Sequence, residues 1–135
     1  MAEKIFVDTS AWVGLFGKND KYHLKAVKIF KSIQKTSGVL YTSDYVIDET
    51  VTTIRMNSNH AQSIFAMDAI LNSRMTAIIH VSPDYFSKST QLYKKYEEQR
   101  FSFTDISSFV ICQHLHISNV FSFDAHFRIA GFNLL

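Results

Sequence analysis

The sequence is poor in cysteine, glycine and proline, and these shortages exclude several classes of protein. The single cysteine, Cys112, cannot form an internal disulfide or a zinc site built from several cysteines. Only four glycines and one proline occur, which argues against a loop-rich or disordered chain. With 47% hydrophobic and 14% aromatic residues, the 135 residues can instead bury a core, as one domain spanning residues 1–135.

Several motifs that bind phosphate or activate a nucleophile are also absent. The chain has no GxGxxG, no GxxxxGK[ST] and no GxSxG pattern, which argues against dinucleotide-binding, P-loop and α/β-hydrolase sites. An aspartyl-phosphate phosphatase needs a second aspartate two residues after the first, but Ser10 stands there after Asp8. The six histidines contain no H-E-x-x-H motif, and most are interpreted as structural or surface residues.

No segment has the composition of a membrane span or a signal peptide. Residues 106–123 carry no formal charge, but many of them are polar, so they predict a buried helix and then a buried strand. The opening MAEKIFVD holds only a short apolar run. Together with the single cysteine, these features predict a cytoplasmic protein without membrane contact.

Short apolar runs alternate with helix-like segments along the chain. The pattern predicts strands at 4–8, 39–42, 76–81 and 119–123, helices at 11–16, 21–36, 44–57, 60–73, 83–100 and 104–116, and a short terminal helix and strand. This alternation is typical of an α/β fold with helices on both faces of a parallel sheet, here about four to five strands. Ligands of such sheets bind outside the carboxyl ends of the strands.

Two of the predicted buried strands end on a carboxylate. Asp8 follows the apolar run of IFVDTS, and Asp124 follows that of VFSFDAHF. Asp105, in RFSFTDISSFV, and Glu49, on a predicted helix, also stand in apolar or special settings. The remaining acids are interpreted mostly as surface charges, among them Glu3, Asp20, Asp68, Asp84, Glu97 and Glu98.

Each of these acids also has a structural interpretation. Asp105 could form a capping box with Ser102, three residues earlier, and either strand-end acid could cap the helix that follows it. The helical periodicity does not choose between Glu49 and Asp48, which flank the apolar stripe of their helix on opposite sides. The structural interpretations are credible one by one and less so together.

If the four carboxylates converge, their chemistry favours a hard divalent cation. Like charges within about 4–6 Å raise one another's pKa values unless a cation lies between them. Oxygen ligands without a cysteine partner suit Mg²⁺ or Mn²⁺. Such ions lower the pKa of bound water and neutralise phosphate oxygens, which is what phosphoryl chemistry requires.

A row of lysines lies along one face of the predicted helix 21–36. The row comprises Lys21, Lys25, Lys28, Lys31 and Lys35. The opposite face carries Tyr22, Ala26, Ile29, Phe30 and Ile33. The row is either the solvated side of an amphipathic helix or a patch that faces nucleic-acid phosphates. The net charge of +2 does not decide between these interpretations.

Three segments, spread from the start to the end of the chain, carry a recognisable pattern: IFVDTSAWVGLF, TSDYVIDETVTTI and FSFTDISSFVICQHLHISNVFSFDAHFRIAGFNLL. Together they resemble the PIN domain, in particular the VapC-like toxin nucleases of bacterial and archaeal toxin–antitoxin pairs. The resemblance implies a three-layer α/β/α fold and an endoribonuclease that depends on Mg²⁺ or Mn²⁺ and hydrolyses RNA with metal-activated water. It also implies a homodimer and an antitoxin partner that blocks the site.

The resemblance also assigns residues. Asp8, Glu49, Asp105 and Asp124 match the family's four acids in order and would be the catalytic metal ligands. Glu49 is preferred to Asp48 because the family's acid precedes the apolar step TV. Ser10 or Thr104 would position a water.

Three alternatives to an RNase toxin remain open at this point. The first is a PIN domain that binds RNA or protein without turnover, and the second is a PIN nuclease of RNA processing or decay. The third is a metal phosphatase for a small substrate. If the chain binds RNA, we expect Lys21, Lys25 and Lys28 to contact its backbone.

Overall fold

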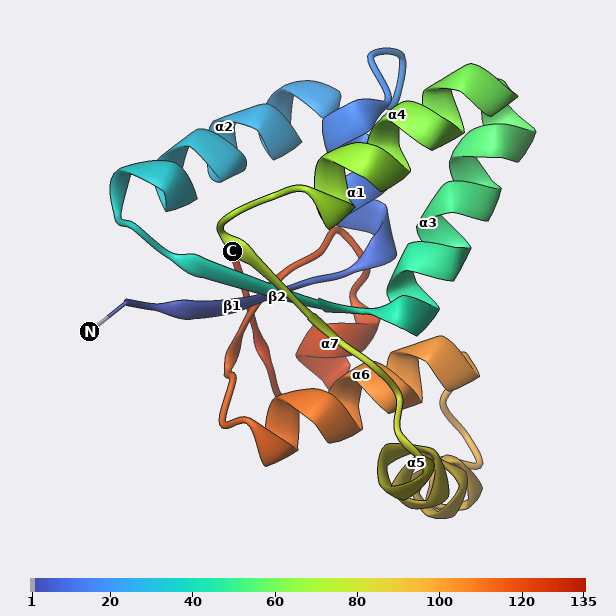
Figure 1. Ribbon diagram of the computed structural model, residues 1–135. Coiled ribbons are helices and arrows are strands. Elements are labelled where there is room, and N and C mark those ends of the chain that lie inside the picture. The colour runs from blue at the N-terminus through green and yellow to red at the C-terminus, as the bar shows by residue number, and fades with distance from the viewer. Residues whose placement is uncertain (1) are drawn as a thin grey trace.

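The computed structural model describes residues 2–135 and contains a parallel sheet of five strands in the order β3-β2-β1-β4-β5 (Figure 1). The strands are β1 Lys4–Val7, β2 Val39–Ser43, β3 Thr76–Ile79, β4 Asn119–Phe121 and β5 Asn133–Leu134. Their apolar residues fill the centre of the molecule, because β1 and β4 lie inside the sheet and are covered on both faces.

Helices cover both faces of this sheet. They are α1 Thr9–Phe16, α2 His23–Lys35, α3 Asp44–Asn57, α4 His60–Leu71, α5 Pro83–Lys95, α6 Phe103–His114 and α7 His126–Ile129. Figure 1 shows α1 to α4 on one side and α5 to α7 on the other, which is the predicted three-layer arrangement. Within residues 2–135, none of the helices has the length and apolar character needed to cross a membrane.

The part of the core around α6 and α7 contains a group of buried aromatic side chains. Phe6, Phe109, Phe121 and Phe127 are all fully buried. The rings of Phe109 and Phe127 meet edge to face at 5.1 Å, and those of Phe6 and Phe127 lie 6.4 Å apart. Such pairs add to the free energy gained by burying apolar area, so they hold α6 and α7 firmly against β1 and β4.

One predicted helix ends earlier than its sequence pattern indicated. The helix expected over 83–100 stops at Lys95, and residues 96–102 form a loop before α6. Lys94 and Lys95 in the last turn complement the negative end of the helix dipole, whereas Glu97 and Glu98 would oppose it. This loop carries Arg100 towards the carboxyl edge of the sheet.

The strands on the two sides of β1 are added to the sheet in opposite directions, so the strand order reverses between β1 and β4. From β1 the chain passes through α1 to α4 and builds β2 and β3 on one side. It then crosses to the other side through α5 and α6 and adds β4 and β5. Parallel sheets of this kind bind ligands outside the carboxyl ends of the strands at such a reversal. The register pairs Val7 with Phe121, so the residues that follow both strands emerge together at this point.

Candidate active site

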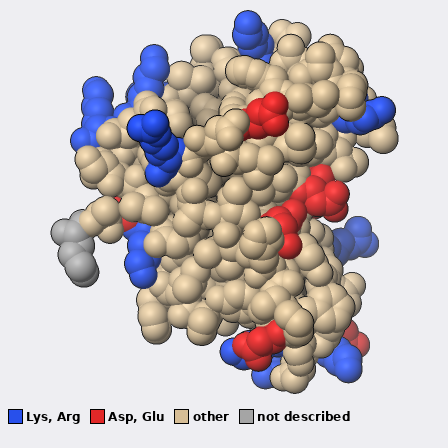
Figure 2. Space-filling view, viewed as in Figure 1, with Lys and Arg blue, Asp and Glu red and all other residues tan. Residues whose placement is uncertain are grey.

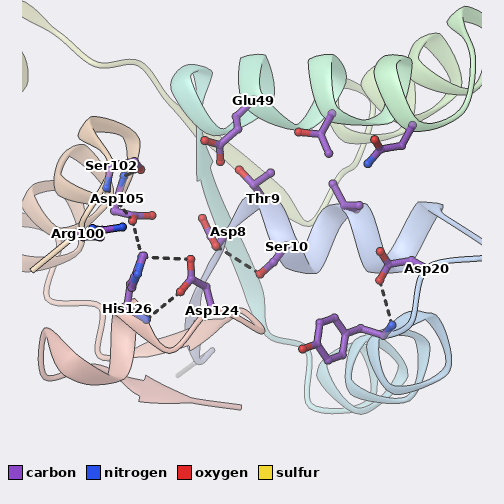
Figure 3. A pocket seen from close by; sticks show the side chains of 14 residues that line it. Asp8, Thr9, Ser10, Asp20, Glu49, Arg100, Ser102, Asp105, Asp124 and His126 are labelled. Carbon is purple, nitrogen blue, oxygen red and sulfur yellow. Dashed lines mark hydrogen bonds and ion pairs between the residues drawn. The ribbon is translucent and has the colours of Figure 1, made fainter.

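A cavity of about 510 Å³ opens at the carboxyl ends of β1 and β4 (Figure 3). The four acids singled out from the sequence all line it, although they come from four separate segments. Asp8 follows β1, Glu49 lies on α3, Asp105 lies in the first turn of α6, and Asp124 lies between β4 and α7. The fold therefore brings together side chains that span most of the chain length.

Asp8 lies deepest, with only 3% of its surface exposed. Its Oδ2 accepts hydrogen bonds from the hydroxyls of Ser122 (3.0 Å) and Ser10 (3.4 Å). Its Oδ1 is buried and has no hydrogen-bond partner in the described part of the chain. Asp8 occupies the position before α1, but its side chain makes no capping hydrogen bond, so the capping interpretation of Asp8 is wrong.

Burial raises the pKa of Asp8 to about 7, and the nearby carboxylate of Asp105 adds to the increase, as does Glu49 to a smaller extent. Hydrogen bonds from the backbone of Thr9 and the hydroxyl of Ser122 act in the opposite direction but do not compensate. A carboxylate held in this way gains from a cation placed next to it, because the cation offsets both burial and repulsion.

Asp105 caps α6 and also lines the cavity. It forms the predicted capping box: its backbone N–H donates to Ser102 Oγ (3.0 Å), and its Oδ2 accepts from the Ser102 N–H (3.1 Å). The same carboxylate is buried, with 6% exposed, and lines the cavity. The cap therefore fixes the orientation of a site residue rather than competing with the site.

His126 connects Asp105 with Asp124 and was missed in the sequence. Its Nδ1 lies 2.9 Å from Asp105 Oδ2 and 3.3 Å from Asp124 Oδ2. The three residues each offer a ligand atom, and these atoms all lie within 4.8 Å of one another. His126 belongs to no local motif such as H-E-x-x-H, because its partner Asp105 is 21 positions away. The signal that the sequence did offer for His126 as a site residue was its position two residues after Asp124.

The backbone of Asp124 is held by side chains around the end of β4. Its N–H donates to Ser122 Oγ (3.0 Å), and its Oδ1 accepts from the backbone N–H of His126 (3.0 Å). This second bond ties the carboxylate to the first residue of α7, but the N-cap of α7 is Ala125, so the capping interpretation of Asp124 is wrong. Its remaining oxygen faces His126.

The structure also chooses between the two acids of α3. Glu49 is half-buried and lines the cavity, whereas Asp48 is exposed and does not. Ser10 lines the cavity as expected. Thr104 does not line the cavity. Its backbone carbonyl accepts hydrogen bonds from the hydroxyls of Ser107 and Ser108.

Several lining residues were not singled out from the sequence. Asp20, interpreted as a surface charge, lines the cavity, as do Tyr22 and Arg100. Figure 3 shows Arg100 beside Asp105, on the side of the cavity opposite to Asp20. Within residues 2–135 the guanidinium of Arg100 makes no ion pair, so it does not neutralise the acids.

All five lysines of the row are exposed, but the helix begins at His23, so Lys21 lies in the turn before α2 and the other four lie along α2. Figure 2 shows Lys and Arg side chains along the side of the molecule where α2 lies. The buried positions opposite the lysines are Ala26 and Ile33, which belong to the core. None of the five lysines lines the cavity.

The geometry is that of a known family. Residues 5–133 match the PIN domain. The chain belongs to the PIN domain family. It is 32% identical over 128 residues to the 23S rRNA-specific endonuclease VapC20 of Mycobacterium tuberculosis, with 95% of each chain covered. These matches confirm the VapC-like PIN nuclease predicted from the sequence.

Solved structures agree with this assignment. The crystal structure of Mycobacterium tuberculosis VapC20, a Sarcin-Ricin loop cleaving toxin, superimposes with a TM-score of 0.88 at 31% identity, with 95% of each chain covered. VapBC2 from Rickettsia felis, bound to a DNA fragment from their promoter, gives a TM-score of 0.69 at 14% identity, covering 98% of this chain and 97% of that one. The first confirms the predicted fold in detail, and the second supports the fold alone.

Proposed function

We propose that this PIN domain cleaves RNA as a toxin-type endoribonuclease, with Asp8, Glu49, Asp105 and Asp124 holding Mg²⁺ or Mn²⁺ in the cavity. The observation that carries the proposal is the carboxyl of Asp8. One of its oxygens is buried without a hydrogen-bond partner, and two further acids act on it electrostatically. A buried polar atom without a partner is unfavourable unless something binds it, and a cation would do so.

The set of side chains fits a hard divalent cation. The cavity offers carboxylate oxygens from four segments and the imidazole of His126, without any thiolate. When bound there, the ion would neutralise phosphate charge and lower the pKa of a nearby water. Arg100 lines the cavity and makes no ion pair with any of the described residues, so its guanidinium can contact a phosphate of the substrate.

The other residues of the site would hold these groups in place. Ser122 and Ser10 fix one oxygen of Asp8, which leaves the other oriented for binding. His126 holds Asp105 and Asp124 close together. Ser10 would also position a water, whereas a similar function for Thr104 has less support because Thr104 lies outside the cavity lining.

The likeness to VapC20 guides the choice of substrate and partners. It supports ribosomal RNA, and the sarcin–ricin loop in particular, as the first substrate to test. We also propose an antitoxin partner, a homodimer and a cytoplasmic location, which the resemblance to VapC-like toxins implies. Lys21, Lys25 and Lys28 would contact the RNA backbone, since all three are exposed: Lys25 and Lys28 on α2, and Lys21 in the turn before it, where Asp20 and Tyr22 line the cavity.

The deciding experiment is cleavage of a sarcin–ricin loop hairpin and of total RNA, with Mg²⁺, with Mn²⁺ and with EDTA. Wild type should cut only with metal, and Asp105→Asn should not cut. Asp68→Asn, which changes an exposed acid on α4, is the matched control and should cut normally. Metal-independent cutting, or equal cutting by Asp105→Asn, would contradict the proposal.

Two alternatives give different results in the same experiment. Metal binding and RNA binding without any cutting would favour a PIN domain without turnover. Hydrolysis of para-nitrophenyl phosphate without RNA cleavage would favour a metal phosphatase. Cutting of total RNA without any preference for the hairpin would favour a function in RNA decay.

A further inference from the structure

An aromatic stack stands beside the acid cavity, outside the set of residues assigned so far. The rings of Tyr22 and Phe123 lie parallel, with centroids 4.5 Å apart and an angle of 7° between their planes. Tyr22 lines the cavity, and Phe123 directly precedes Asp124. The stack therefore joins the start of α2 to the loop that carries one of the four acids.

Two lysines flank this stack. The Nζ of Lys21 lies 5.0 Å from the centroid of Tyr22, and the Nζ of Lys25 lies 6.0 Å from that of Phe123. Both distances are within the range of cation–π attraction. Both lysines are exposed, so their ammonium groups stand at the surface beside the rings. The result is an alternation of aromatic and cationic groups at one edge of the cavity.

Hydrogen bonds fix the stack relative to the acids. The backbone N–H of Tyr22 donates to Asp20 Oδ2 (3.0 Å). The backbone N–H of Phe123 donates to Ser10 Oγ (2.9 Å), and the Ser10 hydroxyl is itself hydrogen-bonded within the network that holds Asp8. A displacement of the stack would therefore disturb the cavity, and a ligand on the stack has a defined position relative to Asp8.

The exposure of the rings distinguishes them from the core aromatics. Phe121 and Phe127 are fully buried, whereas Tyr22 and Phe123 are each half-buried. Half-buried aromatic rings with flanking lysines beside a cavity are the arrangement with which proteins hold unpaired nucleotides, through base stacking and phosphate contacts. The cavity itself is rich in carboxylates and repels phosphates, so cations at its edge would offset this repulsion and attract the RNA backbone.

We propose that the Tyr22–Phe123 stack, with Lys21 and Lys25, binds the nucleotide next to the bond that is cut. An unpaired base takes the place of the Lys21 ammonium on the face of Tyr22 that is turned away from Phe123, and the ammonium groups of Lys21 and Lys25 contact the adjoining phosphates. The proposal rests on the RNase function proposed above and adds to it a requirement: the RNA must present an unpaired base beside the cleaved bond.

The test measures stacking and cleavage separately. Two RNAs carry 2-aminopurine, a fluorescent adenine analogue that is quenched on stacking: a sarcin–ricin loop hairpin and a single-stranded oligoadenylate. Binding is followed by fluorescence in EDTA, so that no metal-dependent cleavage occurs. Tyr22→Leu is compared with Tyr22→Phe, which keeps the ring, and with Tyr93→Leu, which removes an exposed aromatic of α5 (51% exposed).

The expected results follow from the strength of base stacking. Tyr22→Leu should weaken RNA binding by about 5- to 150-fold and abolish the quenching, since a stacked base contributes about 1–3 kcal/mol. Tyr22→Phe and Tyr93→Leu should retain both. Lys21→Gln should lower the slope of log affinity against log salt by about 1, while Lys35→Gln, at the far end of α2, should not. In Mg²⁺, Tyr22→Leu should raise KM more than it lowers kcat.

Other outcomes would overturn the proposal. Equal quenching and affinity for wild type and Tyr22→Leu would exclude stacking at Tyr22, even if the wild type cleaves RNA normally. The absence of quenching of both RNAs by wild type would do the same. Quenching lost in Tyr22→Leu, with no cleavage by any variant, would support the stack and count against the nuclease. If Tyr22→Leu fails to melt cooperatively, the wild-type quenching and the salt slope of Lys21→Gln decide.

Discussion

Replacing Asp8 with asparagine should make the metal-free protein more stable while abolishing its activity. The pKa of Asp8 is raised from 3.8 to about 7 in the folded chain, so the folded state disfavours the ionised carboxylate. A difference of that size corresponds to roughly 4 kcal/mol when Asp8 is fully ionised. The asparagine keeps an oxygen that can accept the Ser122 hydroxyl, and its amide can donate towards Asp105 or Glu49.

The sign of the pH dependence follows from this shift. The folded state holds its proton up to about pH 7, whereas the unfolded chain releases it near 3.8, so ionisation between these values favours unfolding. Asp8 should therefore lower the free energy of unfolding by about 2–3 kcal/mol between about pH 5 and about pH 8. The asparagine variant lacks this contribution.

Urea unfolding in EDTA at several pH values, with wild type beside Asp8→Asn, measures the effect. Subtracting the free energies of unfolding of the two proteins removes the contribution of every titratable group that they share. Asp68→Asn is the control for removal of one negative charge, and its free energy of unfolding should follow that of the wild type at each pH. Adding Mg²⁺ near pH 8 should raise the stability of the wild type towards that of the variant and leave Asp8→Asn unchanged. A difference that does not vary with pH, or a variant less stable than wild type near pH 8, would refute the reasoning.

The remaining predictions concern neighbouring residues. Glu49→Gln should reduce RNA cleavage by about a hundredfold or more, whereas Asp48→Asn should leave it unchanged, because of these two acids only Glu49 lines the cavity. Equal losses of single-turnover cleavage in the two variants would contradict this. His126→Ala should weaken Mn²⁺ binding by about 10- to 100-fold in a calorimetric titration, because it would release Asp105 and Asp124 from each other. Ser102→Ala should lower the free energy of unfolding by about 1 kcal/mol, and cleavage should fall as well, since the cap also orients Asp105; a loss of stability with full cleavage would separate the two functions.

Most of the fold could be read from the sequence because its strands and helices obey simple patterns. The apolar runs of β1 and β4 and the capped starts of α3, α5 and α6 stand where the sequence indicates them. The region after Lys95 is an exception. The composition of its polar residues is compatible with a longer helix, but the helix dipole favours ending α5 at Lys95. Helix propensity alone does not contain that information.

The sequence pointed to the four acids that line the cavity together, but not to the residues beside them. Asp8 and Asp124 follow buried strands, which is visible in the sequence, and the three-dimensional structure was needed to choose Glu49 over Asp48. His126 and Arg100 reach the cavity only because α7 and the loop before α6 fold over the edge of the sheet. Contacts between such distant segments leave no periodic trace in one sequence.

The order of the strands has a consequence for how the site comes into being. β1 is made first, but the strand that lies against it on the side of Asp124 is β4, one of the last segments of the domain. Until α6 and the segment after β4 have been translated, Asp8 and Glu49 lack Asp105 and Asp124, the two acids that line the cavity with them. Catalytic competence would thus arrive late, after most of the polypeptide has left the ribosome. Such a schedule would leave time for an inhibitor made alongside the nuclease to meet it before it can act.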